Sequence, residues 1–158
     1  GYFKPYLKEI TDMMTPAYGQ SELVKKLCAE FQTTDTCAVH VRGGDIVGPG
    51  RAFFERALVR MEKERPGLRY LVFTNDKEAA KEALEGEHTE RKMTYISELG
   101  AFSDIDEFFL MAACRHQIIS NSSYSTWAAY LNPNPEKVVI MPEYKGCEQI
   151  RLKEWIVL

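Results

Sequence analysis

Apolar positions along this chain follow two patterns, which alternate from residue 36 onward. Short, largely continuous apolar runs are typical of parallel strands that are buried on both faces. They predict strands over 37–41, 69–73, 93–96, 117–120 and 137–141. Between these runs, apolar residues recur at the spacing of a helix. They predict helices over 51–64, 77–85, 103–114 and 123–131.

Two further helical segments, 3–14 and 21–31, precede the first predicted strand. The alternation of strand and helix after them predicts an α/β fold with a doubly wound, mostly parallel sheet of about five strands. The 158 residues are the length of one domain. We divide the chain into an N-terminal helical segment (1–35), a sheet domain (36–142) and a C-terminal tail (143–158) that packs on it.

Polar clusters follow three of the predicted strands at the point where each strand ends. These clusters are residues 42–45, 75–76 and 120–125. In an open parallel sheet, ligands bind in the crevice outside the carboxyl ends of the strands. We therefore expect the three clusters to converge on one pocket, which combines a phosphate site with a hydrogen-bonding site for a base.

Arg42 and the two glycines after it supply the chemistry of a phosphate site. A guanidinium group binds phosphate oxygens through two parallel hydrogen bonds, and Gly43 and Gly44 let the backbone approach a ligand because no Cβ intervenes. The alternative is a surface arginine that pairs with Asp45 after a tight turn. The segment is not a Walker A loop, and no G-x-G-x-x-G pattern follows any predicted strand.

The polar run at 120–125 lies where a helix is predicted to begin. A helix N-terminus presents unpaired amides and a partial positive charge, which suit a phosphate group. One of these residues could instead be a simple N-cap. A cap needs one such residue, and the run holds more, so we favour anion binding by Asn121, Ser122, Ser123 and Ser125.

His40, Asn75 and Asp76 are candidates for the base beside the phosphate. An aspartate at a helix start is ordinary complementation of the helix dipole, and a lone histidine on a strand is more often a core residue than a catalyst. The placement of these residues beside the other two clusters favours a role in binding.

Charge and composition exclude several classes of function. A net charge of −3 gives no basic surface for a nucleic-acid backbone. No apolar run approaches the roughly 20 residues that span a bilayer. The 4 cysteines lack C-x-x-C spacing and the 3 histidines are widely separated, so we expect no metal site. The chain begins at Gly1, which leaves open an upstream domain or anchor.

Three stretches resemble the motifs of the alpha-1,2- and alpha-1,6-fucosyltransferase superfamily. Residues 40–45, HVRGGD, resemble its H-x-R-R-x-D motif, and residues 73–76, FTND, resemble its F-S-D-D element. Residues 106–131, DEFFLMAACRHQIISNSSYSTWAAYL, resemble the longer alpha-1,2-fucosyltransferase pattern D-x-x-L-M-x-x-C-K-H-x-I-I-x-N-S-S-F-S-W-W-A-A-W-L. This last resemblance is long, ordered and specific, and the similarity extends over most of the chain.

The resemblance implies the Rossmann-like, donor-binding C-terminal half of a GT-B glycosyltransferase. It implies inverting, metal-independent transfer from GDP-fucose to a glycan hydroxyl, with no cofactor. Carried over by position, Arg42 and Ser122 or Ser123 would hold the β-phosphate. His40 and Asn75 would face the guanine, and Asp76 would accept from its N1–H and amino groups. Adenine offers no such pair of donors.

Departures from the family pattern raise an alternative function. Gly43 stands where the family has a second arginine, Thr126 stands where it has a tryptophan, and the loop from Asp45 to Arg51 is short. The glycine-rich opening of the acceptor domain does not appear. The alternative is a catalytically inactive, fucosyltransferase-derived domain that acts as a binding or scaffold module, with the missing half or a partner protein elsewhere.

Asp45 is the carboxylate in the right loop to act as the catalytic base. An exposed aspartate titrates near pH 4, so it would need a raised pKa for this role. As for location, we expect a cytoplasmic or membrane-peripheral protein, or an organelle lumen where an N-terminal anchor has been removed.

Overall fold

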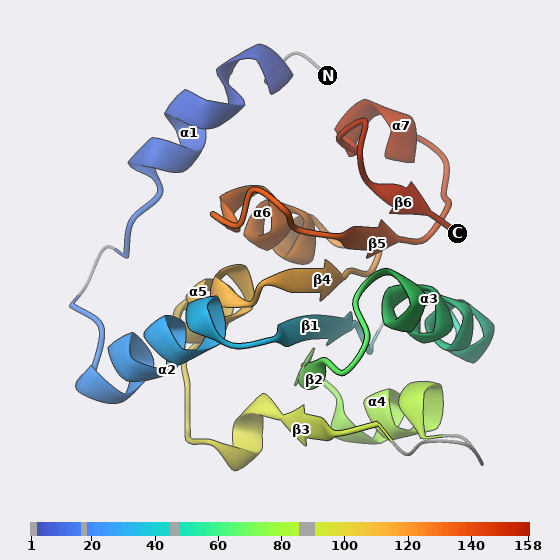
Figure 1. Ribbon diagram of the computed structural model, residues 1–158, viewed down its shortest axis with the longest axis horizontal. Helices are drawn as coiled ribbons and strands as arrows, with labels where there is room; N and C mark the ends of the chain where they lie inside the picture. Colours follow the sequence, from blue (N-terminus) through green and yellow to red (C-terminus); the bar gives the residue numbers. More distant parts are fainter. Residues whose placement is uncertain (1–2, 17–18, 45–47, 86–90) are drawn as a thin grey trace.

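The computed structural model describes residues 3–16, 19–44, 48–85 and 91–158. Its centre is a six-stranded parallel sheet with the strand order β3-β2-β1-β4-β5-β6 (Figure 1). The strands are β1 (Thr36–Val41), β2 (Arg69–Thr74), β3 (Met93–Tyr95), β4 (His116–Ile118), β5 (Val139–Met141) and β6 (Ile156–Val157). The direction of winding reverses between β1 and β4, and such a switch point is where ligands of open parallel sheets bind.

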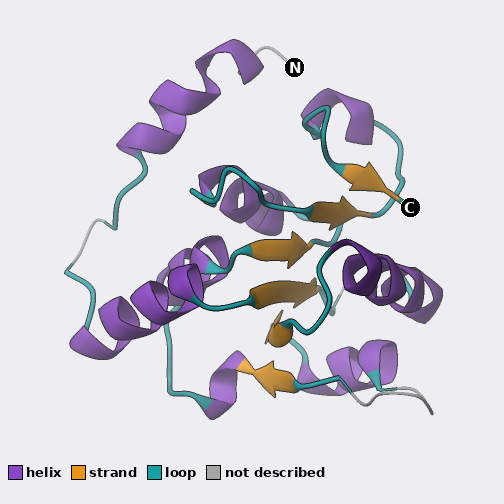
Figure 2. Ribbon diagram, in the orientation of Figure 1, coloured by secondary structure: helices purple, strands orange, loops and turns teal. Residues whose placement is uncertain are grey.

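Helices cover both faces of the sheet (Figure 2). The helical elements are η1 (Lys4–Tyr6), α1 (Leu7–Met13), α2 (Glu22–Thr33), α3 (Arg51–Glu64), α4 (Lys77–Leu84), η2 (Ile96–Glu98), α5 (Asp104–Ala113), α6 (Ser123–Leu131) and α7 (Cys147–Ile150). Apolar residues of α3 and α4 pack on one face, and those of α2, α5 and α6 pack on the other. The predicted α/β class and doubly wound parallel sheet are therefore confirmed.

The burial of β1 explains why its sequence shows no polar alternation. Val39 and Val41 belong to the apolar layer under α3 and α4, whereas Ala38 belongs to the layer under α2 and α5. All six residues of the strand are buried. A central strand that is covered on both faces needs apolar side chains in both directions.

The helices predicted over 21–31 and 103–114 both begin at a serine cap. Ser21 caps α2 by accepting a hydrogen bond from the Val24 amide. Ser103 and Asp106 form a reciprocal capping box at the start of α5. This box fixes the point where the chain enters α5 and thereby the direction of the first helical turn.

The two ends of the described chain pack together on α6. Phe3 lies 5.8 Å from Tyr130, and Tyr130 stacks on Trp155 at 5.1 Å between ring centroids. The Lys4 ammonium group donates a hydrogen bond of 2.6 Å to the carbonyl oxygen of Arg151. The N-terminal helical segment and the C-terminal tail are thus joined by direct contacts.

Two of the differences between the structure and the predicted elements concern the ends of the chain. The C-terminal tail adds a sixth strand, β6, in which Ile156 pairs with Ile140 of β5. Two residues are too few to give a periodic pattern, so the sequence did not indicate this strand. The predicted helix over 3–14 is divided into η1 and α1. Within the described ranges, no helix is long and apolar enough to cross a membrane.

Candidate functional site

A pocket of about 270 Å³ lies at the carboxyl ends of β1 and β2, beside the starts of α5 and α6. It is lined by His40, Arg42, Phe73, Thr74, Asn75, Asp104, Glu107 and Tyr124. The strand-end clusters after β1 and β2 therefore reach the same pocket, as the sequence predicts. The start of α6 contributes Tyr124.

His40 is buried and engaged by a partner from another strand end. Its Nδ1 lies 2.8 Å from Oγ of Ser120, which follows β4. Burial, and then the positive charge of Arg42, lower the pKa of His40 to about 4. The imidazole is therefore neutral at pH 7, and its ring lies 5.6 Å from that of Tyr124. A neutral ring adds a hydrogen-bonding group to the pocket without adding charge.

Arg42 is the cation among the residues that line this pocket. Its Nε is buried and has no hydrogen-bond partner among the described residues. A buried, unpaired guanidinium N–H is costly unless a ligand satisfies it. Asp45, which the sequence analysis considers as a base and as an alternative partner of Arg42, lies outside the described residues.

Asn75 and Asp76 have different surroundings although they are adjacent. Asn75 lines the pocket, and its side-chain amide forms two hydrogen bonds with the backbone of Gly43. Asp76 is the N-cap of α4 and accepts from the amide of Ala79 through Oδ1. It is not among the residues that line the pocket. The carboxylate of Asp76 is thus engaged in helix capping.

Gly43 stands where the resemblance places a second arginine, and packing accounts for the glycine. A Cβ added to Gly43 would lie 2.4 Å from Cβ of Asp76. Real Cβ atoms do not approach other atoms so closely, so a side chain here would displace Asp76 or the chain around it. The site is therefore built around a single arginine at this strand end.

The polar run after β4 is divided between internal and surface positions. Ser120 is fully buried against His40, and Ser125 is buried with its hydroxyl bonded to the carbonyl oxygen of Ser122. Ser122 is the N-cap of α6, although its side chain makes no capping hydrogen bond. Ser123 is exposed on the first helical turn, and Asn121 is half-buried. The pocket lining includes none of Asn121, Ser122, Ser123 and Ser125.

Two carboxylates in the pocket, Asp104 and Glu107, were missed by the sequence analysis. Both lie in the first turn of α5, three residues apart, and such residues share one face of a helix. Burial, and then the charge of Asp104, raise the pKa of Glu107. The signal was present in the spacing of the two acids, but acidic residues are common in the first turn of any helix.

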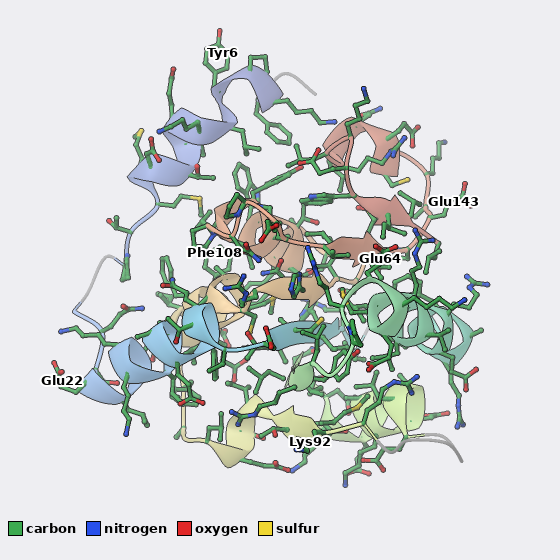
Figure 3. The ribbon with its side chains drawn as sticks, in the orientation of Figure 1. Tyr6, Glu22, Glu64, Lys92, Phe108 and Glu143 are labelled. Atoms are coloured by element: carbon green, nitrogen blue, oxygen red, sulfur yellow. The ribbon has the colours of Figure 1, made fainter. Side chains whose placement is uncertain are left out.

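Tyr124 is a further lining residue that the sequence analysis did not single out. Its hydroxyl donates a hydrogen bond of 2.6 Å to the carbonyl oxygen of Asp104. Phe108 of α5, labelled in Figure 3, packs on its ring with centroids 5.4 Å apart. The tyrosine thereby ties the start of α6 to the start of α5, and it fixes one wall of the pocket.

The pocket combines one cation, two carboxylates, a neutral imidazole and the aromatic rings of Phe73 and Tyr124. This set can bind a ligand that carries both negative charge and hydrogen-bond donors. Among the described residues, no group of three or more His, Cys, Asp or Glu side chains is placed to hold a metal ion.

Comparison with known proteins agrees with these features. Residues 20–158 match the profile described as glycosyl transferase family 11. The chain belongs to this family. Its members include fucosyltransferases, so the resemblance found in the three sequence motifs is confirmed at the level of the family.

Two curated relatives from Escherichia coli are similar to this family 11 chain. It is 28% identical over 151 residues to the O-antigen biosynthesis glycosyltransferase WbnK, and the matched region covers 83% of this chain and 48% of WbnK. It is also 28% identical over 151 residues to an alpha-1,2-colitosyltransferase, and the matched region covers 89% of this chain and 51% of that protein. The chain thus spans about half the length of the curated relatives that it matches.

Proposed function

We propose that this family 11 domain binds GDP-fucose as the donor for glycosyl transfer to a glycan hydroxyl. The observation that carries the proposal is the buried Nε of Arg42, which finds no hydrogen-bond partner among the described residues, in a pocket that Glu107 also lines. The arginine suits a diphosphate, because charge-assisted hydrogen bonds to phosphate are roughly twice as strong as neutral ones.

Glu107 supplies the acceptor for the base in this proposal. A carboxylate has two oxygens that accept hydrogen bonds, and guanine presents the N1–H and 2-amino donors side by side. Adenine has no such pair, so the carboxylate favours guanine. The sequence resemblance implies this contact for Asp76, whose carboxylate caps α4. Membership of the pocket lining supports Glu107 instead.

The reaction is a direct displacement at the anomeric carbon. The acceptor hydroxyl attacks from the face opposite the diphosphate, the C1–O bond to the β-phosphate breaks, and GDP leaves with the bonding electron pair. Arg42 stabilises the negative charge that develops on the departing diphosphate, so it replaces the divalent cation of metal-dependent transferases. The acceptor proton passes to a base, and Asp45 stays the predicted one.

Calorimetric titration with GDP, IDP, ADP and UDP tests the donor assignment. We expect tightest binding of GDP, weaker binding of IDP because it lacks the 2-amino donor, and no comparable binding of ADP or UDP. Arg42→Ala should lower GDP affinity by about 2 kcal/mol, the scale of a lost charge-assisted hydrogen bond. The matched control is Arg60→Ala, which removes an exposed arginine of α3. Glu107→Gln should reduce the preference for GDP over ADP.

Two results would overturn the proposal. Equal GDP affinity in Arg42→Ala would remove the phosphate assignment. The absence of binding of any nucleotide would instead support the scaffold alternative, which the sequence analysis raises because Gly43 stands in place of a second arginine. Hydrolysis of GDP-fucose, measured as the release of GDP, distinguishes a catalytically competent donor site from one that only binds the nucleotide sugar.

A further inference from the structure

Asn75 extends the contact between β1 and β2 beyond the end of their backbone pairing. The last paired residues of the two strands are Val41 and Thr74. One residue later, Oδ1 of Asn75 accepts a hydrogen bond of 2.9 Å from the amide of Gly43, and Nδ2 donates one of 3.1 Å to the carbonyl oxygen of the same residue. A side-chain amide carries one acceptor and one donor group, as a peptide bond does. The side chain therefore takes the place of the next backbone contact.

Arg42 lies between two residues whose backbone is held by hydrogen bonds. Val41 before it is held in the sheet, and Gly43 after it is held by Asn75. Gly48 also lies near Arg42, since a Cβ added to Gly48 would lie 3.0 Å from the carbonyl oxygen of Arg42. The backbone of Arg42 is therefore constrained on both sides along the chain and lies close to a third segment.

The hydrogen bonds of Asn75 also limit what it can offer a ligand. Its carbonyl oxygen is engaged by the Gly43 amide, and its amino group already donates to the Gly43 carbonyl oxygen. The sequence resemblance implies that Asn75 faces guanine, yet both polar groups of its side chain form hydrogen bonds with the backbone of Gly43. What this side chain controls is the segment that carries Arg42.

We propose that Asn75 is a positioning residue for Arg42, acting on a phosphate-bearing ligand through that arginine and not by contact. The identity of the ligand rests on the proposed function. Groups that bind a ligand must be held within about 0.5 Å of their productive position. A flexible side chain such as that of Arg42 meets this requirement only when the backbone that carries it is also held in place. Without the two hydrogen bonds from Asn75 to Gly43, the guanidinium of Arg42 would sample more positions at the end of β1.

A double-mutant cycle separates positioning from direct contact. Asn75→Ala should lower GDP affinity about tenfold in the wild-type background and less than twofold in the Arg42→Ala background, because interacting residues couple and independent ones add. Equal losses in the two backgrounds would show that Asn75 contacts the ligand itself, and would overturn the proposal.

Asn134 provides a matched control. Its side chain also makes two backbone hydrogen bonds, accepting from the amide of Glu136 and donating to the carbonyl oxygen of Arg115. It does not line the pocket. Asn134→Ala should lower the free energy of unfolding about as much as Asn75→Ala does, without changing GDP affinity. If Asn75→Ala behaves in the same way, Asn75 is structural and the proposal fails.

A readout that needs no ligand keeps this proposal distinct from the proposed function. The Nε–H signal of Arg42 can be identified by NMR from its loss in Arg42→Lys. We expect Asn75→Ala to shift or broaden this signal and Asn134→Ala to leave it unchanged. An unchanged signal in Asn75→Ala would overturn the proposal. A wild-type protein that binds no nucleotide would overturn the proposed function alone, and the NMR comparison would still decide the role of Asn75.

Discussion

His40 and Ser120 meet across the switch point of the sheet, with Nδ1 and Oγ 2.8 Å apart. The two residues are 80 positions apart in the sequence, and both are buried. The contact ties the end of β1 to the segment between β4 and α6. Because Nδ1 is engaged in this way, a hydrogen bond from His40 to a ligand has to involve Nε2.

Ser120→Ala should destabilise the fold and loosen the orientation of His40. Removing one partner of a buried hydrogen bond leaves the other unsatisfied and costs about 1–3 kcal/mol. Urea unfolding measures this loss, and Ser97→Ala, at an exposed position of η2, is the control. An equal free energy of unfolding for Ser120→Ala and the wild type would contradict the assigned contact.

Stability should fall between about pH 6.5 and pH 4 because of His40. The pKa of about 4 in the folded protein lies below the ordinary histidine value of 6.5, so in this range the unfolded chain binds a proton that the folded protein excludes. The contribution is fully present above pH 6.5 and decreases by about 3 kcal/mol as the pH falls to 4. His116, whose pKa burial also lowers to about 4, adds to the loss.

His40→Gln isolates the part of this pH dependence that belongs to His40. Urea unfolding at pH 7.5 and at pH 4.5 gives the decrease in the free energy of unfolding for each protein. The variant should show a smaller decrease than the wild type, since His116 still titrates. Identical decreases would exclude a depressed pKa at His40.

Gly43→Ala should destabilise the protein, because the new Cβ would lie 2.4 Å from Cβ of Asp76. Forcing an extra methyl group into a packed site costs about 1–3 kcal/mol. Gly19→Ala is the control, since nothing lies within 4 Å of the added Cβ there. Thermal unfolding should show a lower midpoint for Gly43→Ala than for Gly19→Ala. Equal midpoints would mean that Asp76 moves aside at little cost.

Ser103→Ala should weaken both the fold and GDP binding. The loss of an N-cap costs about 1 kcal/mol, and the helix turn that Ser103 caps carries Asp104 and Glu107 into the pocket. Ser21→Ala removes the N-cap of α2, which contributes no residue to the pocket lining. Chemical unfolding should show similar losses for the two variants. Calorimetry should show weaker GDP binding for Ser103→Ala alone, and equal GDP affinity would separate the α5 start from the site.

The sequence predicts the part of the pocket that depends on parallel strands ending at one edge. His40 and Arg42 at the end of β1, and Asn75 after β2, lie in the pocket because hydrogen-bonded parallel strands bring their carboxyl ends together. The sequence does not reveal Glu107, which lies near the start of a helix whose C-terminal residues belong to the core. Whether a first-turn acid faces solvent or a pocket depends on how the helix is rotated against the sheet.

The apolar pattern by itself determined the α/β class, the five longer strands and the helix starts at Ser21 and Ser103, because these follow from local periodicity and capping. Tertiary structure decided which polar atoms meet. It turned the amide of Asn75 onto Gly43, placed Asp76 where a second arginine would need room, and left Nε of Arg42 buried without a partner among the described residues. The contacts of Gly43 with Asn75 and Asp76 join segments more than 30 residues apart. They depend on strand order and on the space between side chains, and a local sequence pattern determines neither.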